Sequence, residues 1–192
     1  MTLRILVVGV GGQGVLTLAR ILGEAALHAG LDVVLGQLHG MAQRGGSVES
    51  AVIIGTGVQS SFVEQADVVL GLEPLETLRA LPRIGPHTHV LVNLGRQVPF
   101  TLSMQGLRYP DVDSMLQQID QVTPHVTRSD GPALLEQLGQ QRSLNLVLLG
   151  ALARTRGLLP FDEPALRATL TRMSPATRLE ANLRAYDLGR EG

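Results

Sequence analysis

The residues with the clearest potential for chemistry are four glycines within the six residues from Gly9 to Gly14. They follow a continuous apolar run, residues 5–8, which is typical of a strand buried on both faces. From Val15 onward, apolar side chains recur with helical spacing. A strand, a glycine turn and a helix start in this order favour an anion, because the turn lets a ligand approach the backbone and the helix start supplies free N–H groups. We therefore predict that this turn binds a ligand through Gly9, Gly11, Gly12, Gln13 and Gly14.

The same turn satisfies the first half of the dinucleotide-binding pattern. Gly9, Gly11 and Gly14 stand at the spacing of its three glycines. The pattern also requires an acidic residue at the end of the next strand, where it would hold the ribose hydroxyls. Residues 35–39 include no acid, and Asp32 comes too early. The sequence thus leaves three readings open: a phosphate site, a nicotinamide nucleotide site lacking its usual acid, and a tight turn without a ligand.

A second polar, glycine-rich loop runs from His39 to Ser47. It follows a predicted strand over residues 32–38, and so leaves the sheet at the edge where open α/β folds meet ligands and partners. The loop offers an imidazole, an amide and a guanidinium on a backbone of unusual freedom. We predict binding residues at His39, Gln43, Arg44, Gly45 and Gly46, with a surface loop lacking any partner as the alternative.

Other polar residues give weaker signals. The histidines show no metal-ligand spacing, and no serine stands in a nucleophile motif, so we predict neither a catalytic residue nor a metal site in this chain. His28 is expected to cap the first helix at its carboxyl end. Ser60 and Ser61 are expected to cap a short helix over residues 61–65.

Apolar patterning predicts an α/β protein. Strands are expected at residues 5–8, 32–38, 47–54, 66–72, 88–93 and 122–127, and helices are expected at 15–29, 73–79, 113–121, 130–138, 143–156, 161–172 and from 174 onward. The first two strands would be joined by a helix as a parallel βαβ unit. Residues 95–110 form a connection whose shape the sequence does not determine, with short antiparallel strands as one option. The fold class is an open, mainly parallel Rossmann-like sheet with helices on both faces and a helical C-terminal part.

Composition places limits on domain number and partners. The 192 residues predict a single domain, 1–192, with a sheet core over 1–128 and a helical part over 129–192. A net charge of −1 argues against a nucleic-acid or membrane-surface partner. The absence of cysteine excludes disulfides and thiolate-bound clusters. The chain enters its first strand with no leader pattern and has no run long enough to span a membrane, so a cytoplasmic location is expected.

Five segments together resemble a known family. They are GVGGQGVLTLARILGEAA from Gly9, HGMAQRGGSVES from His39, ADVVLGLEPLETLR from Ala66, HVLVN from His89 and NLVLLGALA from Asn145. They are similar to the gamma-type subunits of 2-oxoacid:ferredoxin oxidoreductases, and a free-standing chain of this size most resembles the beta subunits of the indolepyruvate enzymes. The paired glycine turn and QRGGSV element is the most specific part of the resemblance.

The resemblance implies a reaction and a set of partners. The reaction is the oxidative decarboxylation of a 2-oxoacid with coenzyme A, which yields an acyl-CoA, carbon dioxide and reduced ferredoxin. It requires thiamine diphosphate and iron–sulfur clusters. This chain has no cysteine and no Gly-Asp-Gly thiamine motif, so those sites are expected on a larger partner subunit, through which ferredoxin is also reached. The two loops would face that partner and the coenzyme A or substrate channel. A pyruvate or 2-oxoglutarate enzyme, a stand-alone nucleotide-binding protein and a purely structural protein remain alternatives.

Overall fold

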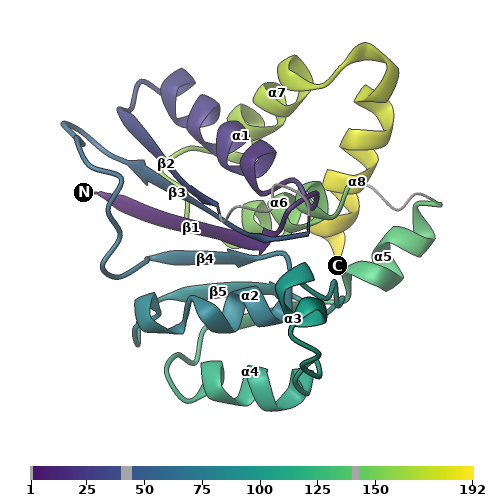
Figure 1. Cartoon of the computed structure of the whole chain (residues 1–192). Coiled ribbons are helices and arrows are strands. Elements are labelled where there is room, and N and C mark those ends of the chain that lie inside the picture. Colours follow the sequence, from purple (N-terminus) through teal and green to yellow (C-terminus); the bar gives the residue numbers. More distant parts are fainter. Residues whose placement is uncertain (1, 40–44, 140–142) are drawn as a thin grey trace.

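The computed structural model describes residues 2–39, 45–139 and 143–192, and Figure 1 shows the chain in sequence colours. The elements are β1 Leu3–Val10, α1 Val15–His28, β2 Val33–His39, β3 Ser47–Ile54, β4 Val68–Gly71, α2 Pro74–Arg79, β5 His89–Asn93, α3 Phe100–Met104, α4 Val112–Asp120, β6 Val126–Ser129, α5 Gly131–Gln137, α6 Leu144–Arg154, α7 Glu163–Met173 and α8 Leu179–Glu191. Within these ranges, no helix is both long and apolar enough to cross a lipid bilayer.

The described strands form one mixed sheet in the order β2-β3-β1-β4-β5-β6. β1, β4, β5 and β6 pair in parallel, whereas β3 runs antiparallel to both of its neighbours, β1 and β2. β1 and β2 therefore point in the same direction, as expected for a βαβ unit. This mainly parallel sheet, covered by helices on both faces and followed by a helical segment, confirms the predicted fold class.

The position of β3 corrects the simple βαβ expectation. β2 and β3 are consecutive strands in the chain, and they pair as antiparallel neighbours. β3 then lies between β1 and β2 and pairs with β1 from Leu3↔Ile54 to Val10↔Ser47. As a result, β1 and β2 are not neighbours in the sheet.

Burial on both faces of β1 explains its continuous apolar run. Ile5 and Val7 belong to the core on one face, and Leu6 and Val8 belong to the core on the other. The first core includes residues of α1, α6, α7 and α8, and the second includes residues of α4. The helical C-terminal segment thus packs on the same face of the sheet as α1 (Figure 1).

Three local predictions need correction. Residues 61–65 are irregular, not helical, and Ser60 Oγ accepts a hydrogen bond from Phe62 N (3.2 Å) without capping a helix. A five-residue helix would be too short to be stable by itself, and here Ser61 packs against Gly36 of β2. Residues 95–110 contain the short helix α3 and no strand. The last strand begins four residues later than predicted, at Val126.

Candidate functional site

The glycine turn has the geometry that its sequence predicts. β1 ends at Val10, and α1 begins at Val15, directly after Gly14. Gly12 and Gly14 have φ values of 104° and 86°, which side-chain-bearing residues rarely adopt. Gly14 is the N-cap of α1 and provides no side-chain acceptor for the first N–H groups of the helix. The start of α1 is therefore suited to an external acceptor such as a phosphate oxygen.

The two predicted loops meet at this edge of the sheet. Gly11 N donates to Gly46 O (2.8 Å), and Gly45 N donates to Gly11 O (3.3 Å). Gly45 O in turn accepts a hydrogen bond from Phe100 N (2.7 Å). His39 ends β2 at the same edge, whereas Gln43 and Arg44 lie outside the described residues. The structure thus brings Gly45 and Gly46 to the glycine turn, and the binding role of both loops stays a prediction.

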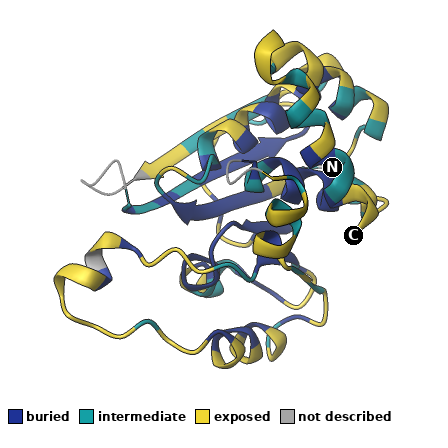
Figure 2. Cartoon of the chain, turned by 90° about the vertical axis from the view of Figure 1, so that its right-hand side faces the viewer, coloured by how far each residue is buried: buried dark blue, intermediate teal, exposed yellow. Residues whose placement is uncertain are grey.

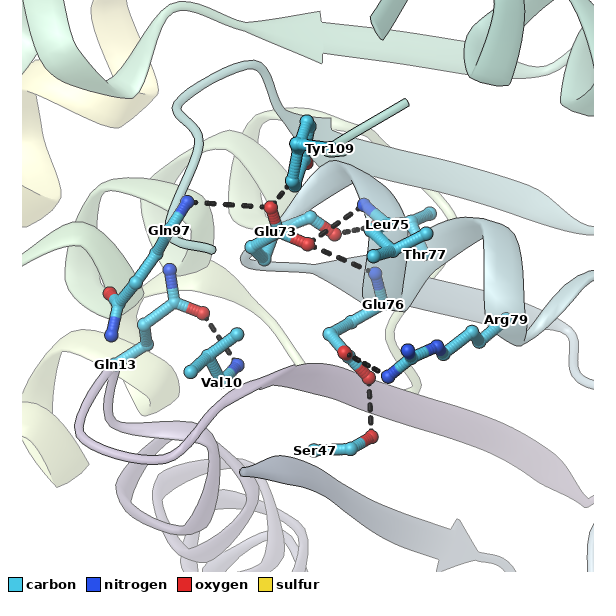
Figure 3. Close-up of polar contacts among 10 residues, drawn as sticks. All are labelled: Val10, Gln13, Ser47, Glu73, Leu75, Glu76, Thr77, Arg79, Gln97 and Tyr109. Atoms are coloured by element: carbon cyan, nitrogen blue, oxygen red, sulfur yellow. Dashed lines mark hydrogen bonds and ion pairs between the residues drawn. The ribbon is translucent and has the colours of Figure 1, made fainter. Parts of the chain in front are cut away.

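The Gln13 side chain stabilises the glycine turn through two hydrogen bonds. Its Oε1 accepts a hydrogen bond from Val10 N (2.7 Å), and its Nε2 donates to Leu72 O (3.1 Å) at the end of β4. Asn93 Nδ2, from β5, donates to the same Leu72 carbonyl at 2.9 Å. Figure 3 shows Gln13 reaching back to Val10. These contacts fix the shape of the turn relative to the ends of three parallel strands, β1, β4 and β5.

A cleft of about 500 Å³ opens beside the turn, at the carboxyl ends of β1 and β5. Its lining includes Gly12–Gly14, the segment after β5, the start of α6 and residues 173–175. The lining residues described here include two arginines, Arg96 and Arg178, and no carboxylate. Two helix starts and two guanidinium groups favour an anionic ligand. The chain runs from β1 through α1 to β2 on one side of β1, and from β4 through α2 to β5 on the other side. The cleft lies near this reversal of strand order, which is the usual ligand position in open α/β folds.

Sequence reasoning missed three side chains of this cleft. Arg96 follows β5 at the carboxyl edge, so its position after a predicted strand could have identified it. Arg178 and Asn145 come from the helical C-terminal segment, whose placement over the glycine turn no local pattern encodes. Asn145 packs closely on the turn, because a Cβ added to Gly14 would lie 2.6 Å from Asn145 Nδ2.

The topology also bears on the dinucleotide reading. In a dinucleotide-binding fold, the strand beside β1 carries the acidic residue that holds the ribose. Here the neighbour of β1 on that side is the antiparallel strand β3, and β2 lies one position further out. The carboxyl end of β2 is therefore displaced from the glycine turn by a strand, and residues 36–38 there carry no acid. Both observations disfavour a nicotinamide nucleotide.

Two buried glutamates, Glu73 and Glu76, connect α2 to the segments beside the cleft (Figure 3). Glu73 is fully buried and caps α2, since its Oε2 accepts from Leu75 N (2.8 Å) and Glu76 N (3.1 Å). Its Oε1 accepts from the Tyr109 hydroxyl and from Gln97 N (3.4 Å). This confirms the helix-start role that Pro74 and the acids of residues 73–76 indicate. Glu73 thereby ties the cleft segment at Gln97 to α2.

Glu76 connects α2 to the second loop. Its side chain, 2% exposed, accepts hydrogen bonds from Ser47 Oγ and from Arg79 Nη1 (2.7 Å). Ser47 directly follows Gly45 and Gly46, so this contact positions the end of the loop that bonds to Gly11. Burial is the main reason that the pKa of Glu76 lies above its ordinary value of 4.5, although Ser47 and Arg79 oppose the rise.

The raised pKa of Glu76 predicts a pH-dependent stability difference. The folded state binds this proton more tightly than the unfolded chain, so the contribution of Glu76 is largest below about pH 4.5 and falls as the pH rises through its raised pKa. In Glu76→Gln the side chain cannot ionise, so the variant does not lose this contribution to stability as the pH rises. We expect the free energy of unfolding of the wild type, minus that of the variant, to decrease as the pH rises from about 4.5 towards neutrality.

Urea denaturation of both proteins at a series of pH values measures this difference. Exposed Glu64 offers the matched control, and Glu64→Gln should show a much smaller change in the same comparison. A wild-type-minus-Glu76→Gln difference that stays constant or grows over this pH range would contradict the assignment.

The histidines take structural positions. His28 Nδ1 lies 2.7 Å from Glu24 O, in the last turn of α1, which confirms the predicted C-terminal capping. His89 and His125 stack on each other with ring centroids 4.5 Å apart at the opposite end of the sheet. Among the residues with described positions, no three His, Asp or Glu side chains are grouped as a metal would require.

A family model and a sequence relative both match nearly the whole chain. The family model described as pyruvate ferredoxin/flavodoxin oxidoreductase matches residues 4–192. Indolepyruvate oxidoreductase subunit IorB of Methanothermobacter thermautotrophicus is 37% identical over 188 residues, covering 97% of this chain and 95% of the relative.

Solved structures show the same fold. The keto/oxoacid ferredoxin oxidoreductase gamma subunit of Geobacter sulfurreducens is similar with a TM-score of 0.73 at 22% identity, covering 100% of this chain and 95% of that one. The 2-oxoglutarate:ferredoxin oxidoreductase of Magnetococcus marinus, solved with 2-oxoglutarate, coenzyme A and succinyl-CoA bound, is similar with a TM-score of 0.74 at 20% identity, covering 99% of this chain and 30% of that one. With nearly its whole length matched by the family model and by a relative above 30% identity, the chain belongs to the pyruvate ferredoxin/flavodoxin oxidoreductase family.

Proposed function

We propose that this chain is the small subunit of an indolepyruvate, or aryl-pyruvate, ferredoxin oxidoreductase. The complex would decarboxylate a 2-oxoacid oxidatively and transfer the acyl group to coenzyme A, with ferredoxin as the electron acceptor. The identity of 37% to an IorB subunit along nearly the whole of both chains supports this substrate class. The observation that carries the proposal for this chain is the cleft at the glycine turn, with its two arginines.

The cleft fits the phosphate-bearing end of coenzyme A. Gly12 leaves open space, because a Cβ there would meet no atom within 4 Å. Gly14 begins α1 without a side-chain cap, and Arg96 and Arg178 line the same cleft. These groups would hold phosphates through N–H donors and charge, and they would exclude water from one end of the ligand. Coenzyme A itself would supply the thiol that accepts the acyl group.

The remaining cofactors do not fit this chain. Iron–sulfur clusters are held by cysteine thiolates, and the sequence contains no cysteine. It also lacks the Gly-Asp-Gly motif expected of a thiamine diphosphate site. We therefore assign thiamine diphosphate, the clusters and the contact with ferredoxin to a larger partner subunit. This chain would complete the complex by binding coenzyme A and closing one side of the channel with the glycine turn and the His39–Gly46 loop.

A substrate panel tests the proposal. The chain is co-expressed with its larger subunit, and ferredoxin reduction is followed with indolepyruvate, pyruvate or 2-oxoglutarate at saturating coenzyme A. We expect kcat/KM to be highest for indolepyruvate. Preference for pyruvate or 2-oxoglutarate would reassign the substrate within the family. Tight binding of a nucleotide by the isolated chain, with no 2-oxoacid-dependent turnover in any complex, would favour a stand-alone nucleotide-binding protein.

A further inference from the structure

The segment between β5 and α4, residues 95–110, carries an unusual set of exposed apolar side chains; we call it the arm. Val98, Phe100, Met104 and Leu107 are 48%, 53%, 71% and 57% exposed. In Figure 2 the arm, at lower left, stands off from the sheet and is coloured mainly as exposed. Four large apolar side chains within ten residues of a projecting segment are typical of a surface that a partner covers.

Several contacts anchor the arm to the rest of the protein. Leu102 is 8% exposed and belongs to the core on the α4 side of the sheet. The Tyr109 hydroxyl donates to buried Glu73, and Phe100 N donates to Gly45 O (2.7 Å). The buried side of the arm is thus fixed by defined contacts, while Phe100 and Met104, one helical turn apart in α3, remain exposed.

The charge of the arm restricts what can cover it. Residues 95–110 contain Arg96 and Arg108 and no carboxylate. In a two-fold dimer with one arm packed on the other, four arginines would meet without a compensating acid, which is unfavourable. A surface that is apolar at its centre and acidic at its rim complements the arm better.

We propose that the arm docks onto the larger, thiamine-bearing subunit, on an apolar surface with an acidic rim. This inference rests on the proposed function, which supplies that partner. Phe100 and Met104 provide the centre of the contact, and Leu107 and Arg108 provide its edge. Docking here would also reach the ligand cleft, because Phe100 bonds to Gly45, Gly45 bonds to Gly11 of the glycine turn, and Arg96 of the arm lines the cleft.

The test measures assembly of the complete complex. The small subunit is produced as wild type and as Phe100→Ser/Met104→Ser, and the dissociation constant for the larger subunit is measured by mass photometry across a dilution series. Loss of two central apolar contacts is expected to weaken assembly about 30-fold. Phe62→Ser/Leu27→Ser is the matched control, since these side chains are 77% and 53% exposed outside the arm, and it should assemble like the wild type.

A second variant changes the charge of the arm and tests docking without removing an apolar side chain. Arg108→Glu should weaken assembly and reduce its dependence on salt, whereas Arg20→Glu, on the exposed surface of α1, should not. Thermal unfolding of each variant checks that the chain is intact. Wild-type affinity in both arm variants overturns the docking proposal while leaving the proposed function standing.

Two further outcomes are decisive. If the wild-type chain fails to bind the larger subunit at all, the proposed function falls, and the docking proposal falls with it. If the arm variants separate a homodimer of the small subunit but leave the heteromeric complex unchanged, a second copy covers the arm, and the docking proposal is overturned.

Discussion

Replacing Arg96 and Arg178 together by alanine is expected to raise the KM for coenzyme A about 100-fold, since each charged hydrogen bond to a phosphate contributes about 1.5 kcal/mol. Both arginines line the cleft beside the glycine turn, and both are exposed. Their removal should therefore change ligand binding far more than it changes folding. The expected kcat at saturating coenzyme A is close to that of the wild type, because we propose that the reacting groups lie on the larger subunit.

Steady-state kinetics of the purified complex with varied coenzyme A measures this effect. Arg20→Ala, on α1 and outside the lining of the cleft, is the matched control and should leave the KM unchanged. The thermal midpoint of the double variant should stay within a few degrees of the wild-type value. An unchanged KM for coenzyme A in an intact double variant would show that the cleft does not hold the phosphates.

The second large effect concerns stability at the crossing of α6 and α8. Gly189 of α8 faces the backbone of α6 so closely that an added Cβ would lie 1.9 Å from Val147 O and 2.7 Å from Val147 C. Gly150 of α6 makes the reciprocal approach, 2.0 Å from Tyr186 O. Backbone atoms cannot rotate away as side chains can, so the helices would have to separate. We expect Gly189→Ala to lower the free energy of unfolding by about 3 kcal/mol, the upper part of the range for overpacked cores.

Thermal and urea denaturation measure this change. A loss of about 3 kcal/mol corresponds to a decrease in Tm of about 9 °C for a chain of this size. Gly23→Ala in α1 is the matched control, because its Cβ would meet the flexible end of Leu35 at 3.3 Å and because alanine favours the helix. We expect that control to change stability by less than about 1 kcal/mol in either direction. Equal effects of the two substitutions would contradict the close helix crossing.

The parts of the fold that local physics determines were predictable from the sequence. The run at residues 5–8 is continuously apolar because β1 is buried on both faces, and the glycines that follow are required where φ is positive at Gly12 and Gly14. The capping acids Glu73, Asp111 and Asp162 begin α2, α4 and α7, where backbone N–H groups need acceptors. Each of these signals lies within a few residues of the feature that it determines.

Features set by tertiary contacts were not predictable in this way. The insertion of β3 between β1 and β2 depends on pairing between strands whose local patterns suit either order. Arg178 reaches the cleft because the C-terminal helices pack across the turn, some 160 residues later in the chain. Residues 61–65 are irregular because a helical pattern over five residues is too weak to form a helix, and Ser61 at their start packs against Gly36 of β2.

Omission of one subunit at a time tests the central claim most directly. The larger subunit, this chain and the reconstituted complex are each supplied with indolepyruvate, coenzyme A and oxidised ferredoxin, and the formation of reduced ferredoxin is followed. The account predicts rapid reduction by the complex and background rates from either subunit alone, with the activity restored when this chain is added back. Full activity of the larger subunit without this chain would contradict it.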